Sequence, residues 1–139
     1  MIENLEQYFA EEHQFYLNKI KFERVEGEQV AGEVSLNCRD NIAVTVSNGR
    51  GVTLIVTRRL EFDPRSLFNL EVSFGAELTF IQEKRDEINW SDIDLADEFK
   101  KNGGFVLANI MNRISLLIGQ ITSSFGNTPL ITPPGIPCE

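Results

Sequence analysis

Apolar and polar residues alternate along several stretches of the chain, most clearly in residues 67–80. There, apolar side chains from Phe68 to Phe80 occupy every second position. This period predicts a β-strand with one buried face. About fourteen residues at ~3.3 Å each would span ~46 Å, which is long for a compact chain of this size. We therefore expect the strand to bend at a bulge or kink at Gly75, or to continue into a sheet shared between subunits.

The same alternation occurs in residues 33–46, where only Asp40 interrupts the apolar row and a bulge or turn is expected. A second run follows in residues 51–62. The residues between them, Asn48-Gly49-Arg50-Gly51, tolerate the positive φ angles of tight turns. This pattern predicts an antiparallel β-hairpin.

An edge strand is expected earlier in the chain, where Leu17, Ile20 and Phe22 supply apolar side chains. Asp63-Pro64-Arg65 marks a turn between the hairpin and the long strand. We therefore expect four antiparallel strands within residues 17–80.

After residue 80 the period changes from two to that of helices. Ser91 is a favourable N-cap and Gly103 a favourable C-cap, which predicts a short helix over about residues 92–102. In residues 105–125 the apolar positions recur at steps of three and four, the pattern of an amphipathic helix. Polar residues interrupt it too often for a membrane span. We expect this helix to cover the sheet and to end at Gly126.

The predicted fold is α+β: a four-stranded antiparallel sheet covered by a long C-terminal helix, with a short helical linker before it. The chain has 139 residues, enough for one domain. Its expected segments are an N-terminal segment (1–16), the sheet (17–80), the linker (81–104), the long helix (105–125) and an apolar, extended tail (126–139).

The charge balance bears on the partners. The net charge is −8, with 21 acidic against 13 basic residues and no cluster of Lys and Arg. Nucleic acid is therefore not an expected partner. The N-terminal residues lack the basic start and apolar run of a signal peptide. Cys38 and Cys138 have no zinc-type spacing with His13, so we expect reduced thiols, a cytoplasmic protein and no metal.

No residue pattern in the chain indicates catalysis. His13 has no nearby serine, cysteine or carboxylate cluster, and Glu71 and Glu77 are expected on a solvated sheet face. Gly103-Gly104 precedes a helix but lacks the spacing of a phosphate loop. We therefore expect a protein that is not an enzyme and needs no cofactor.

Two stretches of the chain show a resemblance to a known family. They read VTRRLEFDPRSLFNLEVSFGAELTF and FGNTPLITPPGIP, and the order of elements over residues 17–137 agrees. In these features the chain resembles the SecB family of protein-export chaperones. The resemblance implies a homotetramer, a dimer of dimers in which sheets join edge to edge and long helices pack between dimers. It implies binding of unfolded client polypeptides and a possible export motor like SecA, while some relatives serve toxin–antitoxin systems.

The resemblance also implies apolar grooves between sheet, linker and tail that hold unfolded chains. The groove residues we expect are Trp90, Leu95, Phe99, Phe105, Leu130, Ile131 and Ile136. The tail is then either groove wall or part of the core, with prolines keeping it extended. A carrier of a small hydrophobic ligand and an adaptor that pairs through its sheet edge are the alternatives that the residues leave open.

Overall fold

The computed structural model describes residues 2–26, 32–47, 49–124 and 130–134. Its elements in chain order are the 3-10 turn η1 (Leu5–Tyr8), the strands β1 (Gln14–Arg24), β2 (Ser35–Ser47), β3 (Gly51–Asp63) and β4 (Phe68–Thr79), the 3-10 turns η2 (Arg85–Glu87) and η3 (Trp90–Asp92), and the helices α1 (Leu95–Asn102) and α2 (Gly104–Ser123).

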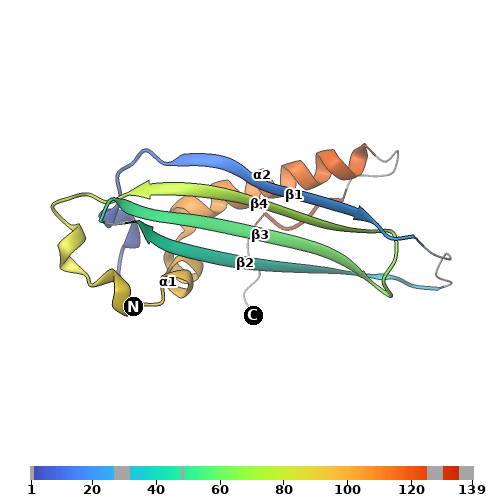
Figure 1. Cartoon of the computed structure of the whole chain (residues 1–139), viewed down its shortest axis with the longest axis horizontal. Helices are drawn as coiled ribbons and strands as arrows, with labels where there is room; N and C mark the ends of the chain where they lie inside the picture. The colour runs from blue at the N-terminus through green and yellow to red at the C-terminus, as the bar shows by residue number, and fades with distance from the viewer. Residues whose placement is uncertain (1, 27–31, 48, 125–129, 135–139) are drawn as a thin grey trace.

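The four strands form one antiparallel sheet in the order β1-β4-β3-β2. β2 and β3 are the predicted hairpin, and their register is unbroken from Ser35 opposite Asp63 to Ser47 opposite Gly51. Gly49, in the turn, has a φ of 73°, a left-handed value that favours glycine. Figure 1 shows the strands running along the long axis of the molecule, with α2 on one side of the sheet. The predicted α+β fold is confirmed.

The core lies between the sheet and the two helices. Alternate residues of β3 and β4 point to the same face, and α2 packs against β4 on that face. The buried apolar side chains of these elements include Leu54, Val56, Leu60, Leu70, Val72, Ala76, Ile110, Met111, Ile114 and Ile118. Full burial of a large apolar side chain contributes about 1.5–3 kcal/mol, so this interface dominates the stability of the fold.

An irregularity in the sheet lies in β1 and not at Gly75, where a bulge or kink was expected. The β1–β4 register shifts between Leu17 and Lys19, so Asn18 is an extra residue, and its side chain donates a hydrogen bond to Ser73 Oγ at 2.9 Å. Gly75 instead lies opposite Tyr16, and a Cβ there would come within 2.3 Å of the Tyr16 ring. The glycine is required because the tyrosine covers it.

The linker helix starts later than the sequence predicts. Asp94 is the N-cap of α1, and its Oδ1 accepts a hydrogen bond from the Asp97 N–H at 3.2 Å. Ser91, the expected N-cap, lies in η3, and its hydroxyl donates to Asn89 Oδ1. The turn η3 buries Trp90, which delays the start of the helix. Gly103 is the C-cap, as expected, and its N–H donates to the Phe99 carbonyl.

The long helix α2 begins and ends within two residues of the predicted bounds, and the expected end at Gly126 lies outside the described residues. By length and composition alone, α2 is also long and apolar enough to cross a membrane. In the fold, its residues Val106, Ile110, Ile114 and Ile118 are fully buried in the core.

Candidate functional site

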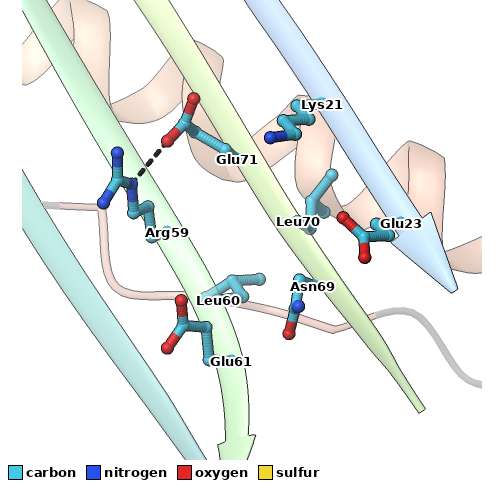
Figure 2. Close-up of a pocket in the computed structure, with 8 residues that line it drawn as sticks. All are labelled: Lys21, Glu23, Arg59, Leu60, Glu61, Asn69, Leu70 and Glu71. Atoms are coloured by element: carbon cyan, nitrogen blue, oxygen red, sulfur yellow. Dashed lines mark hydrogen bonds and ion pairs between the residues drawn. The ribbon is translucent and has the colours of Figure 1, made fainter. Parts of the chain in front are cut away.

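The face of the sheet away from α2 is polar and carries a row of charges. Lys19 Nζ lies 2.9 Å from Glu71 Oε2, and Arg59 Nε pairs with the other oxygen of this carboxylate. These two donors hold the pKa of Glu71 below its usual value. Figure 2 shows the residues that line a hollow at this pair, with Arg59 of β3 and Glu71 of β4 pointing toward each other. Glu71 is thus bound in two ion pairs, an arrangement that stabilises a sheet surface.

Four of the predicted groove residues lie at one end of the sheet. Phe99 and Phe105 have ring centroids 6.2 Å apart, and Phe9 contacts both of them and Trp90. The indole N–H of Trp90 donates to the Arg85 carbonyl at 2.8 Å. Trp90, Leu95 and Phe99 are buried in the core, and Phe105 is half-buried. In this conformation the first three offer little apolar surface to a ligand, and their role in a groove stays a prediction.

The predicted tail residues lie elsewhere. Leu130 and Ile131 lie beside Gly119 of α2. A Cβ added at Gly119 would lie 3.7 Å from the Leu130 carbonyl oxygen and 3.8 Å from Ile131 Cδ1. Gly119 is fourteen residues after Phe105, about 21 Å along a helix. Ile136 lies outside the described residues. The structure therefore divides the predicted groove residues into a buried linker group and a tail group.

Apolar side chains that sequence reasoning did not assign to a site lie on the edge strands. On β1, Leu17, Ile20 and Phe22 are between 43% and 50% exposed, although they lie on the same face as α2. We refer to these three residues as the β1 row. The spacing from Leu17 to Ile20 is odd, so only the extra residue at Asn18 puts them on one face. This odd spacing is the signal that could have identified the bulge.

At the opposite edge, a hollow lies between β2 and α1. It is lined by Asp40, Asn41 and Ile42 of β2, by Ala96, Asp97 and Lys100 of α1, and by the N-cap Asp94. We refer to it as the β2 trough. Ile42 and Ala96 supply its apolar surface, while the carboxylates surround it. Further along the covered face of β2, Leu36 is 38% exposed, so apolar surface continues beyond the trough.

A buried ion pair forms part of the trough wall. Asp40 and Arg58 are directly opposite on β2 and β3, and the carboxylate accepts hydrogen bonds from Arg58 Nε at 2.7 Å and Nη2 at 2.8 Å. Both side chains are buried. Burial acts to lower the pKa of Arg58, but the hydrogen bonds and charge of Asp40 outweigh it and the pKa is raised. The bulge expected at residues 39–41 is absent from the β2–β3 register, because Asp40 faces inward to pair with Arg58.

The remaining guanidinium nitrogen of Arg58 binds the tail. Its Nη1 donates to the Pro133 carbonyl at 2.6 Å and to Thr132 Oγ1 at 2.9 Å. Ser115 Oγ of α2 donates to the same carbonyl at 3.0 Å. Nearer the end of α2, the Leu130 N–H donates to Thr122 Oγ1 at 2.8 Å. Residues 130–134 are therefore held on the covered face of the sheet by polar groups of β3 and α2.

Within residues 2–26, 32–47, 49–124 and 130–134, no three His, Cys, Asp or Glu side chains are grouped so that they could hold a metal ion. The ring of His13 packs against Phe15 and Phe105, at 6.1 and 5.8 Å between centroids. The features that could bind a ligand or partner are thus the β1 row, the β2 trough, and the contacts of Arg58 with residues 130–134.

Comparisons with known proteins show the fold. The chain resembles the structure of the Mycobacterium tuberculosis Rv1957 SecB-like chaperone in complex with a ChAD peptide from the Rv1956 HigA1 antitoxin. The TM-score is 0.63 at 13% identity, over 87% of this chain and 89% of that one. A Streptococcus agalactiae protein of unknown function matches at a TM-score of 0.38 and 10% identity, over 88% of this chain and 97% of that one.

No protein-family model matches the chain. No curated protein matches it either. The structural match confirms the resemblance expected from the sequence: the chain has the SecB-like fold, with an open four-stranded antiparallel sheet and a long C-terminal helix. At 13% identity, the match describes the fold that the two chains share.

Proposed function

We propose that this protein is a molecular chaperone that binds unfolded or nascent polypeptide segments. The observation that carries the proposal is the apolar surface left open on the covered face of the sheet, at β1 and at β2. Contiguous exposed apolar surface on a folded domain marks an interaction site. The solved SecB-like chaperone with the same fold was captured with an antitoxin peptide, which supports peptide binding as the task.

We assign the client segment to the β2 trough and the surface continuing from it. The trough has apolar groups at Ile42 and Ala96, and it is bordered by α1, as the groove expected from the sequence is bordered by the linker. Burial of apolar side chains is non-directional, so clients of many sequences would bind. The net charge of −8 favours encounter with basic segments and keeps a client-loaded protein soluble.

We assign the β1 row to a second copy of the chain. β1 is an edge strand, so the outer side of its backbone faces no other strand in the part of the chain that the structure describes. Pairing two β1 strands would extend the sheet and bury Leu17 and Ile20. The proposed homo-oligomer, a dimer of dimers, follows from this contact together with packing of the long helices.

The cellular setting is a further part of the proposal. The antitoxin peptide in the solved relative supports a toxin–antitoxin client for this chain. Protein export with a SecA-like motor is the alternative setting. The sequence has only two cysteines, which agrees with a reducing compartment, and we place the protein in the cytoplasm as part of this proposal.

The test is light scattering of the protein alone and with an excess of a permanently unfolded client. The wild type should have the mass of about four chains and gain the mass of the client. Ala96→Glu places a charge in the trough and should weaken client binding about tenfold or more, because a charge is costly to bury. The matched control is Ala43→Glu, the same change at an exposed position on the opposite face of β2.

Ile20→Glu tests the second assignment, since it should lower the mass of the assembly. Lys21→Gln, on the other face of β1, changes the net charge by the same single unit and is the matched control. A wild-type monomer that does not bind the client would overturn both assignments and direct the search to a small hydrophobic ligand.

A further inference from the structure

Residues 130–134 of the tail are held by hydrogen bonds of the kind that a protein makes to a bound peptide. Arg58 uses Nε and Nη2 for Asp40 and directs Nη1 at the Pro133 carbonyl, 2.6 Å away. Thr122 Oγ1 accepts the Leu130 N–H at 2.8 Å. Two of the three elements of this contact, β3 and α2, are rigid parts of the core. The receptor groups are therefore fixed, whereas the segment that they hold is a short extended run.

The tail is held mainly by polar contacts, because it buries little apolar surface. Leu130 is half-buried, Ile131 is 84% exposed, and Pro133 and Pro134 are exposed. A segment that made the same backbone contacts and buried larger side chains would therefore have a higher intrinsic affinity than the tail. The tail has one advantage over it, a high effective concentration, because it belongs to the same chain.

Arg58 and Thr122 bind backbone groups of the tail that are three residues apart. The site needs an N–H at the position of Leu130 and a carbonyl three residues later, at the position of Pro133. A hydroxyl at the position of Thr132 adds a further acceptor for Arg58. Any polypeptide offers these backbone groups, with the one restriction that proline has no N–H and so cannot take the first position.

Arg58 also makes simple loss of the tail unfavourable. Its guanidinium is buried and charged, so without the tail Nη1 would lose its two short contacts, to the Pro133 carbonyl and Thr132 Oγ1, while the longer contact to Ser115 Oγ at 3.4 Å remains. An incoming carbonyl restores this contact. Exchange of one segment for another is therefore favoured over an opening of the tail alone.

We propose that Arg58, Ser115 and Thr122 form a binding site for an extended polypeptide segment, occupied here by the chain's own residues 130–134, and that a client segment exchanges with them. This inference rests on the proposed chaperone function, and it names both a second contact for the client and the backbone pattern that is recognised. The site lies next to the β2 trough, because Asp40 lines the trough and accepts a hydrogen bond from Arg58. One client chain would fill the trough and displace the tail.

The experiment uses the full-length protein and a fluorescent peptide with the sequence of residues 126–137, followed by anisotropy. Thr132→Val weakens the tail alone, since it removes the buried hydroxyl with little change of shape. It should raise the affinity for the peptide by about tenfold, the usual value of a hydrogen bond to a charged group. Adding Thr122→Val removes an acceptor that the tail and the peptide share, so it should leave this affinity about unchanged while the tail still occupies the site. Ser123→Ala, which removes an exposed hydroxyl bonded only to its own helix, should change nothing.

A second peptide, with proline at the position of Leu130, should bind Thr132→Val more weakly than the first peptide does, and Thr122→Val should remove this difference, because the acceptor of the N–H is then gone. Equal binding of the two peptides to Thr132→Val, or no peptide affinity gained on Thr132→Val, would overturn the exchange. Binding of an unfolded client is measured in parallel on the wild type. If the client binds while the peptide series is flat, the exchange fails and the proposed function stands; if no client binds, the proposed function fails whatever the peptides show.

Discussion

Asp40 and Arg58 face each other directly across β2 and β3, joined by two hydrogen bonds of 2.7 and 2.8 Å inside an otherwise apolar face. Asp40→Ala removes the carboxylate that faces the buried guanidinium of Arg58, so we expect it to lower the free energy of unfolding by about 3–5 kcal/mol. The double variant Asp40→Leu/Arg58→Met should recover most of this loss. Urea unfolding of the two variants measures the difference, and Arg59→Met on the open face is the control, with a change within about 1 kcal/mol. A single variant as stable as the control would show that the pair does not stabilise the fold.

The contact between Tyr16 and Gly75 gives a steric prediction. Gly75→Ala would place a Cβ 2.3 Å from the tyrosine ring, so the ring must move. We expect a loss of about 1–3 kcal/mol, the usual cost of overpacking. In Tyr16→Ala the added methyl group has space, so the same glycine substitution should then cost much less. A double-mutant cycle in urea measures the coupling, and additive effects would contradict the contact.

The ion pairs of Glu71 predict a dependence of stability on pH. Because Lys19 and Arg59 lower the pKa of Glu71 in the folded state, the pairs stabilise the fold above the unfolded pKa of about 4.3. This contribution is lost as the pH falls through the folded pKa. Wild type should therefore be more stable than Glu71→Gln at pH 7, and the two should converge in strong acid. Urea unfolding at a series of pH values checks this, and a difference that is constant with pH would contradict it.

Two of the predicted groove residues have opposite positions: Phe99 lies in the core and Ile131 on the surface. Phe99 is fully buried, so Phe99→Ala should cost about 3–5 kcal/mol of stability. Ile131 is 84% exposed, so Ile131→Ser should change stability by about 0.5 kcal/mol or less. Thermal unfolding measures both. If Ile131→Ser also weakens client binding, the tail contributes to the client surface as the sequence predicts; a large loss of stability would instead place Ile131 in the core.

The arrangement of elements was predictable because the apolar positions change period where the structure changes type. The sheet, the hairpin and the long helix follow from this pattern. The odd step from Leu17 to Ile20 and the charges at Asp40 and Arg58 each break the alternation, and each break has a structural cause. The first is a bulge, and the other two form a cross-strand pair whose register the sequence pattern does not specify.

The surroundings of the predicted groove residues do not follow from the sequence, for a physical reason. An apolar side chain in a linker has the same sequence pattern whether it lines a groove or fills the core. Trp90 and Phe99 are buried because Phe9, from the N-terminal segment, packs on both of them, and Phe80 also packs on Trp90. The hold on the tail depends on a carbonyl, Pro133 O, and every residue carries one. Backbone recognition of this kind leaves no mark in a sequence.

The position of α2 bears on how many client segments an assembly of the proposed chaperone could bind. The helix packs on β4, and the two outermost strands lie about 14 Å apart, three strand spacings across the sheet. A subunit joined to a neighbour along one margin therefore keeps its other margin accessible. Assembly and loading need not compete for the same surface, so the number of client segments carried should rise in proportion to the number of subunits.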